Sequence, residues 1–550
     1  MVAKLFCKLA GLVRSKFMVF GSETKLTVSC LQVLCRATDA RTVAKSCPDL
    51  VKTSILTYFN NVADDLDNTV KNLETGKYTH LRGTHLKTST SLNYVQVAVI
   101  PVLTALFDHL ASNEFGADLL LEDVQVACYR ILNAIYILGA RLDLHRGKSF
   151  VKTEMDRHRP AYGNCLGAFA ACFPVAFLEP AYNKFNPSCI HSKQQEHSLE
   201  AQAVMAQLES SMPSVDELIA NVDRFVTSGT RYADQPHIIE VIVPMLCAYL
   251  PFWWSQGPDN VPPSAQGHHV TMVTAEHLNR ALRSILNLLK RTVAVHDSPW
   301  MITIAAHAGQ IVINSSEELL DDTVLPLTEK IFSVMDTLFK REESMRAFLK
   351  SSAEDTSEIE NQLQEEYALL TRDIYAFYPL LIKYIDLQRN HWLKNNVQSA
   401  EVLYNLIAHM FNMWNKSQYF RREEANFIST HEIDNMALIM PYSASTKGRP
   451  IMQSMGPSGS SGGSQSGKKE KKKKKRDAKR DKEKEMAASL MVACLKRILP
   501  VGLNLFAGRE QELVQHTKEK FLNKENDEVI REYVNIQLTL PDKSSNNSSS

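Results

Sequence analysis

The feature that most constrains the fold is the spacing of apolar residues, which follows a helical period along nearly all of the 550-residue chain. A wide stripe of this kind runs from Leu119 to Leu138, and another runs from Ile331 to Phe339. Apolar residues three and four positions apart lie on one face of a helix, whereas a half-buried strand needs strict alternation. Alternating segments bounded by turns are few. The pattern therefore predicts an all-α fold.

Prolines recur inside these apolar helical runs, at Pro101, Pro244, Pro326, Pro379 and Pro500. A proline inside a helix kinks its axis, whereas a proline in the first turn loses no hydrogen bond. In stacked helix pairs, either outcome curves a helix around the neighbouring layer. We therefore predict an irregular α-solenoid of stacked antiparallel helix pairs, HEAT- or armadillo-like, with disordered insertions. An irregular helical protein with ordinary prolines is the alternative.

Helix starts have their own signals. Ser214 with Glu217 and Ser315 with Glu318 have the spacing of capping boxes. The N-terminus could pass for a targeting peptide, but Lys8 breaks its apolar run and no small-residue cleavage pattern follows. We expect instead an amphipathic first helix. Its predicted buried face consists of Leu5, Leu9, Leu12 and Val13.

Composition divides the chain into helical parts and linkers, because Ser, Gly and charge runs bury too little apolar surface to offset the entropy of ordering. We expect helical solenoid in three parts, a first part over 1–187, more solenoid over 213–256 and a second part over 272–442, followed by a C-terminal helical segment over 486–541. A variable connection at 188–212 and a Pro-rich loop at 257–271 separate the solenoid parts. A disordered linker at 443–485, Ser/Gly-rich and then Lys-rich, precedes the C-terminal segment, and a disordered tail follows at 542–550.

The formal net charge of +1 hides an asymmetry. The run 468–485 holds 12 of the 62 basic and 5 of the 61 acidic residues, which leaves 50 basic against 56 acidic residues elsewhere. A mildly acidic folded part argues against a nucleic-acid partner. The Lys run resembles a nuclear-localisation or anionic-surface patch, but its interleaved Asp and Glu favour a solvated insertion.

One uncharged stretch, 161–178, nearly reaches the length of a membrane span. It contains Asn164, two glycines, Pro174 and many alanines, so its hydrophobicity is modest. We predict a buried helix that ends near Pro174, and no membrane span in this chain.

The sequence offers no catalytic, cofactor-binding or metal-binding residues that we single out. The ten cysteines are scattered without CxxC or zinc-ligand spacing, which indicates buried free thiols in a reducing compartment. Phosphate-loop, dinucleotide, zinc-protease and nucleophile-elbow motifs are absent. The Glu-rich stretch 354–366 lacks the central glycine of an EF-hand loop, so we expect a solvated helix face. The sequence therefore predicts neither an enzyme nor a cofactor.

Three weaker candidates have a plain structural interpretation. His268 and His269 could hold a metal ion, but they lie in a Pro-rich loop without a third ligand nearby. Trp253 and Trp254 suit aromatic packing better than a binding platform. The helix 489–497 has the basic-apolar character of a calmodulin target, but Pro500 interrupts it early, which favours a core helix.

Longer strings of sequence go further than these motifs. They are 39–43 (DARTV), 123–130 (DVQVACYR), 174–180 (PVAFLEP), 236–254 (PHIIEVIVPMLCAYLPFWW), 378–382 (YPLLI), 391–393 (HWL), 422–427 (REEANF) and 499–504 (LPVGLN). In these strings the chain resembles ryanodine receptors of an invertebrate-like kind, which are intracellular calcium-release channels. The matches run in order from about Lys4 to Leu540. They weaken at 188–212, 255–270 and 443–485.

The resemblance implies a place in a larger assembly. The chain is similar to the later part of the large cytosolic helical solenoid, the bridging or second helical domain. In the family, four subunits form a channel on the endoplasmic or sarcoplasmic reticulum, and this solenoid belongs to the cytosolic shell. Its partners would be the rest of the channel and neighbouring subunits of the homotetramer, with calmodulin weakly suggested. Family sequence continues upstream of Lys4, so we expect Met1 to be an internal methionine or the start of a truncated gene model.

Two other classes stay open. A stand-alone armadillo- or HEAT-like scaffold fits the helical pattern equally well and differs only in lacking the family strings. An enzyme with an unrecognised site would need converging polar residues in a deep pocket.

Overall fold

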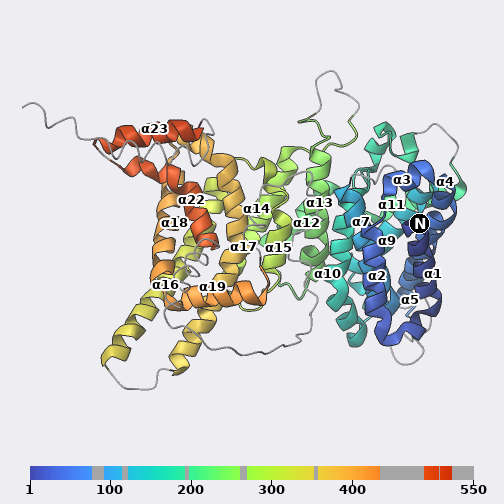
Figure 1. The fold of residues 1–550 in the computed structure, drawn as a ribbon, viewed down its shortest axis with the longest axis horizontal. Helices are drawn as coiled ribbons and strands as arrows, with labels where there is room; N and C mark the ends of the chain where they lie inside the picture. Colours follow the sequence, from blue (N-terminus) through green and yellow to red (C-terminus); the bar gives the residue numbers. More distant parts are fainter. Residues whose placement is uncertain are drawn as a thin grey trace, which may run out of the picture. The chain divides into compact units, whose positions relative to one another are not determined.

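In the computed structural model, the described residues are 1–76, 92–113, 122–192, 197–260, 269–351, 357–433, 489–506 and 508–522. All regular secondary structure within them is helical, and none of them lies in a strand (Figure 1). The prediction of an all-α fold is therefore confirmed. The stacking of its helices as a solenoid stays a prediction. The linker 443–485 and the tail 542–550 lie outside the described residues.

The chain divides into two compact units. In its described part, unit 1 comprises Met1–Arg291 and Thr303–Ser315, and unit 2 comprises Thr292–Ile302, 316–433 and 489–522 without residue 507.

The helices that lie wholly or mainly in unit 1 include both long helices and single turns. They are α1 (Val2–Phe20), α2 (Thr24–Arg36), α3 (Ala40–Ser46), α4 (Pro48–Leu50), α5 (Leu56–Glu74), α6 (Leu92–Tyr94), α7 (Ile100–Ser112), α9 (Glu122–Ala140), α10 (Ser149–Cys172), α11 (Leu199–Ser211), α12 (Val215–Thr227), α13 (Val243–Trp254), α14 (Ala275–Thr292) and α15 (Met301–Ala308). The central helix of this unit is α10, which packs against α7, α9 and α13.

Unit 2 is built around one long helix. Its helices are α16 (Leu325–Ser351), α17 (Ser357–Asn395), α18 (Gln398–Lys416), α19 (Gln418–Thr430), α22 (Leu490–Gly502) and α23 (Glu510–Leu522). The middle of α17 is buried almost all round, as a core helix should be, and it packs against α16, α19 and α22. Although α22 follows the long linker in sequence, it returns to pack on α17 and α18.

Among the described residues, four short π-helical turns lead into α-helices, and three of these turns are followed by a proline. The three are Val95–Val99, Ile238–Ile242 (labelled η8) and Leu320–Val324, and each is followed by an α-helix whose second residue is Pro101, Pro244 or Pro326. A proline ring clashes with the carbonyl four residues earlier. A π turn widens the backbone at that point, which gives the ring room. These three prolines therefore lie inside continuous helical segments, just after a π turn, and Pro379 and Pro500 also lie inside helices.

The apolar face predicted for the first helix is not the face that the fold buries. Leu5 and Leu12 are 53% and 49% exposed, and Leu9 is half-buried. The residues that α1 buries are Ala3, Phe6, Ala10, Val13 and Phe17. The reason is aromatic packing: Phe6 meets Tyr58 at a ring-centroid distance of 5.0 Å, and Phe17 meets Tyr94 at 5.1 Å. Two phenylalanines bury more surface than two leucines, so they decide which face turns inward.

The uncharged stretch 161–178 behaves as predicted. Residues 161–172 of it lie in α10, which ends at Cys172 just before Pro174, and the residues of the stretch are mostly buried. A different helix has the length and composition to cross a membrane, namely the continuous helix Leu92–Ser112, with a mean hydropathy of 1.5 in its most apolar window. Two thirds of that window is buried inside the protein, at 67%, and the helix packs on α2 and α10.

The structure describes helix starts near three of the predicted boundaries. The stretch 188–212, expected to be a connection, contains α11, whose first turn is capped by Ser198. At Ser214 the predicted cap forms, because the Glu217 backbone N–H donates to its hydroxyl at 3.2 Å. The Ser315 hydroxyl donates to the carbonyl of Val312 at 2.7 Å, and the next helical segment begins at Leu320.

Candidate functional site

The histidine pair is only partly visible, because His268 lies outside the described residues. His269 is half-buried. Among the residues that the structure describes, no group of three or more His, Cys, Asp or Glu side chains could hold a metal ion. The Glu-rich stretch 354–366 is described from Ser357 onward, where it forms the first turns of α17.

Trp253 and Trp254 have different structural roles. Trp253 is buried, with its ring centroid 5.0 Å from that of Phe252 and 5.9 Å from that of Tyr249. Trp254 donates its indole N–H to Asp259 at 3.0 Å, which ties the helix end to the following turn. These contacts agree with the packing interpretation.

All ten cysteines are free thiols. Seven of them are buried, Cys7 is half-buried, and Cys30 and Cys47 are exposed. Burial raises the pKa of the Cys35 thiol to about 12 and that of Cys172 to about 12. A thiol with so high a pKa stays protonated at neutral pH and is a poor nucleophile. The expectation of buried thiols is met at seven positions and fails at Cys30 and Cys47.

The helix with calmodulin-target character is part of a core. In α22, Met491, Cys494 and Ile498 are buried against α17 and α18, and Arg497 donates to Asp386 at 3.0 Å. The apolar face that a calmodulin-like partner would bind is therefore already covered within unit 2. The core-helix interpretation is the one that the packing supports.

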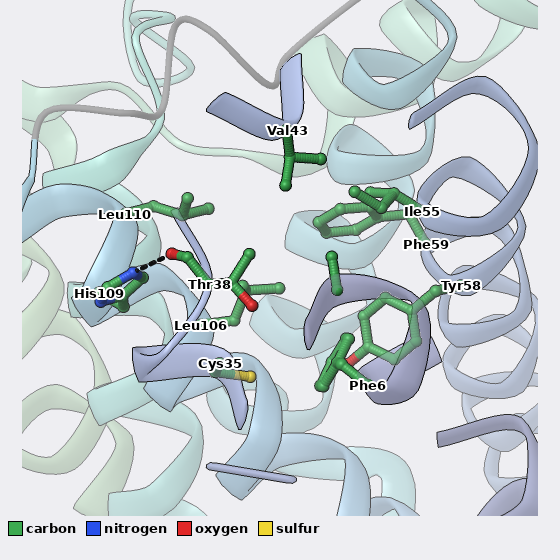
Figure 2. Close-up of a pocket in the computed structure, with 11 residues that line it drawn as sticks. Phe6, Cys35, Thr38, Val43, Ile55, Tyr58, Phe59, Leu106, His109 and Leu110 are labelled. Atoms are coloured by element: carbon green, nitrogen blue, oxygen red, sulfur yellow. Dashed lines mark hydrogen bonds between the residues drawn. The ribbon is translucent and has the colours of Figure 1, made fainter. Parts of the chain in front are cut away.

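One apolar cavity of about 30 Å³ lies in unit 1 (Figure 2). Side chains from α1, α2, α5 and α7 surround it, together with residues of the segment between α2 and α5. Its lining is almost wholly apolar, and its polar edge is made by His109, whose Nε2 contacts the Thr38 carbonyl at 2.7 Å. A cavity of this size holds about one water molecule, so it cannot take a substrate.

A larger groove of about 270 Å³ lies between α1 and the start of α5. Lys8, Gly11 and Arg14 line one wall. The Arg14 guanidinium is already engaged, because it donates to both carboxylate oxygens of the buried Asp65 at 2.8 Å.

Two buried carboxylates tie unit 2 together. Glu342 accepts from the Tyr367 hydroxyl at 2.7 Å, from the Ser417 hydroxyl at 2.5 Å and from the backbone N–H of Gln418 at 3.3 Å. Arg346 lies one helical turn away on α16 and also donates to Glu342. This carboxylate therefore joins α16, α17 and the start of α19.

Glu424 on α19 makes the second junction. It accepts hydrogen bonds from the Tyr375 hydroxyl at 3.0 Å, from the Trp414 indole N–H at 2.7 Å and from the Ser489 hydroxyl at 2.8 Å. Burial raises its pKa, against the opposing effect of these three donors. The Ser489 hydroxyl also caps α22 by accepting from the Met491 N–H, so the junction positions the helix that follows the long linker.

Unit 1 has a polar cluster where α10 meets η8. Arg159 is buried and donates to Asp156 at 2.8 Å and to the carbonyl of Gly139. Glu240 accepts from the Tyr232 hydroxyl at 2.8 Å, and burial raises its pKa. Shifted pKa values are common among active-site residues, but networks with a purely structural role shift pKa values as well. Each carboxylate described in this subsection is engaged by donors of the protein itself.

His237 lies at the start of η8 and gives this cluster a predicted pH response. Burial, and then the charge of Arg159, lower its pKa to about 4 from an ordinary 6.5. Between those values the unfolded chain binds a proton that the folded chain does not, so stability falls as the pH falls. We expect acidification from pH 6.5 to pH 4 to remove on the order of 2 kcal/mol more from the wild type than from His237→Leu, after allowance for partial exposure. Urea unfolding across this range measures the difference, and parallel profiles for the two proteins would contradict it.

No known protein-family model matches the chain.

Proposed function

We propose that the chain is a cytosolic scaffold segment of a ryanodine-receptor-type calcium-release channel. The observation that carries the proposal is the run of family-like strings, which follow one another in order along nearly the whole sequence. The chain would form part of the shell that links regulatory domains to a distant pore on the endoplasmic or sarcoplasmic reticulum. Its place would be the cytoplasmic face of that membrane, and the pore would belong to other parts of the channel.

The location of these strings supports the proposal. The string 236–254 covers η8 and α13, most of whose residues are buried. The string 378–382 lies in the buried middle of α17, and 422–427 contains the junction residue Glu424. Core and junction positions are where a fold constrains sequence most, so likeness there fits a shared architecture.

The role that we propose is mechanical. Helices that pack mainly on their neighbours make a body that can bend a little at each layer. Small rotations then add up between peripheral regulator-binding regions and the gate, and their effect is a coupling free energy between sites. The expected partners are the rest of the channel and adjacent subunits of a homotetramer. Calmodulin is a weaker candidate, because α22 would first have to leave unit 2.

A segment-replacement channel tests the proposal. Residues 4–540 would replace the corresponding segment of a full-length ryanodine receptor, expressed in cells that lack the native channel. A matched control would carry an unrelated helical-repeat protein of equal length, which represents the rival stand-alone scaffold. We expect caffeine to release stored Ca²⁺ through the first channel and not through the control, because only the first restores the contacts of the shell.

A further inference from the structure

The outward face of α1 and α2 exposes large aliphatic side chains that a soluble helix normally buries. On α1, Leu5 is 53%, Leu12 is 49% and Val19 is 80% exposed. On α2, Leu26 is 63% and Val33 is 58% exposed. Single exposed leucines are common on protein surfaces, but several on two adjacent helices form a patch of the kind that marks an interaction site.

The spacing puts these residues on one side of each helix. Leu5 and Leu12 are seven residues apart, as are Leu26 and Val33, so each pair lies two turns apart along the same face. The half-buried Leu9 continues the stripe between Leu5 and Leu12, whereas Val19 follows a break in helical geometry at Lys16.

The opposite side of each helix forms the core of unit 1. On α1 the core side carries Ala3, Phe6, Ala10, Val13 and Phe17, and on α2 it carries Thr24, Val28, Leu31 and Cys35. The helices α1 and α2 pack directly on each other (Figure 1), and we call the surface made by their outward sides the α1–α2 face.

Five exposed cations lie on or next to the two helices that form this face. Lys4, Lys8, Lys16, Lys25 and Arg36 are all exposed, and none of the five forms an ion pair with another described residue. Residues 1–36 contain six basic residues and one acidic residue. Outside this hairpin and the Lys run 468–485, the chain carries 44 basic and 55 acidic residues. Apart from the Lys run, the positive charge is therefore concentrated in residues 1–36, on a chain that is acidic elsewhere.

We propose that the α1–α2 face binds an acidic amphipathic helix of a partner protein. Two parallel aliphatic stripes are the surface that such a helix recognises, because its own apolar residues at every third, fourth and seventh position pack between them. Carboxylates that flank the apolar stripe of the partner would pair with the five exposed cations and would speed encounter.

Two other occupants fit the face less well. Membrane-surface helices place Trp and Phe at the interface, whereas the exposed large residues here are Leu and Val. A second copy of the chain bound symmetrically through this face would set the five cations of one subunit against the five of the other, which is repulsive. The inference goes beyond the proposed channel role and does not depend on it.

The test uses the full chain and a synthetic helical peptide about three heptads long, with leucines along one face and glutamates flanking them. Fluorescence anisotropy would measure its binding. We expect one saturable site, an affinity that falls with added salt, and about a tenfold or greater loss in the double variant Leu12→Glu with Val33→Glu. Leu199→Glu is the matched control, since Leu199 is 85% exposed on α11, and it should bind as the wild type does.

Circular dichroism would establish that the double variant folds, which is expected because both positions are exposed. The inference is overturned by the absence of saturable peptide binding, or by equal binding to the wild type and the double variant. It is also overturned if the wild type binds phosphatidylserine vesicles and not the peptide, or if it forms a dimer that the double variant does not form. Vesicle binding alone would assign the face to a membrane, and the dimer would assign it to a copy of the chain.

Discussion

Among alanine substitutions at the described glycines, Gly163→Ala is expected to destabilise unit 1 the most. A Cβ at this position of α10 would lie 1.7 Å from the carbonyl oxygen of Glu240 and 2.8 Å from its carbonyl carbon. Both atoms belong to the backbone of η8, so no side-chain rotation can relieve the overlap, and the two helical segments must separate. We expect a loss of at least about 3 kcal/mol in the free energy of unfolding, measured in urea.

Alanine variants of two other glycines provide a comparison for the stability of Gly163→Ala. Gly11 on α1 has no atom within 4 Å of the position that an added methyl group would take, so Gly11→Ala should be neutral or should stabilise the helix by about 1 kcal/mol. Gly167, one turn beyond Gly163, would place its Cβ 3.2 Å from the Pro244 carbonyl oxygen, and its alanine variant should fall between the two. If all three variants had equal stability, the close crossing of α10 and η8 would be disproved.

Loss of the Glu424 carboxylate is expected to have the second large effect. Glu424→Ala leaves the buried Tyr375 hydroxyl, the Trp414 indole N–H and the Ser489 hydroxyl without their shared acceptor. A buried donor without a partner costs about 1–3 kcal/mol, so we expect a loss of about 3–5 kcal/mol in unit 2. Because Ser489 begins α22, hydrogen exchange should show that Leu490–Gly502 loses its protection before the rest of the unit.

Glu365→Ala is the matched control, since Glu365 is an exposed carboxylate on α17. Its stability should stay within about 0.5 kcal/mol of the wild type. Unchanged exchange of α22 in the Glu424 variant would show that its packing on α17 and α18, and not the carboxylate, positions that helix.

The helical class could be predicted because it depends on local periodicity alone. The composition of 161–178 was enough to predict a buried helix, and the helix there ends just before Pro174 as expected. Prolines inside apolar helical runs were also expected, and Pro101, Pro244 and Pro326 lie in such runs, each just after a π turn. The π turns before them were missed, because no motif in the sequence marks them.

The inward face of α1 could not be assigned from its own sequence, because the helix carries two apolar stripes. Leu5, Leu9 and Leu12 make one stripe, and Phe6, Val13 and Phe17 belong to the other. Which of them is buried depends on Tyr58 and Tyr94, which arrive from distant parts of the chain. The prediction identified an apolar face correctly and assigned it to the wrong side, and that exposed stripe is now the basis of the α1–α2 face.

The buried carboxylates were missed for a related reason. Glu424 meets a tyrosine 49 residues upstream and a serine 65 residues downstream, across a linker that no local pattern can bridge. Glu240 did have a signal, since it stands alone inside the apolar run IIEVIV. An isolated acid in such a run indicates either a buried partner or a break in the helix, and here the partner is Tyr232.

The central claim, that the chain is a scaffold segment of a calcium-release channel, is tested most directly by caffeine-evoked Ca²⁺ release through the segment-replacement channel. We predict release close to that of the intact receptor, and no release when an unrelated helical repeat of the same length takes the place of residues 4–540. The claim would be contradicted if the channel that carries this chain assembled into tetramers and reached the reticulum but released no Ca²⁺. Equal release with the unrelated repeat would contradict it as well.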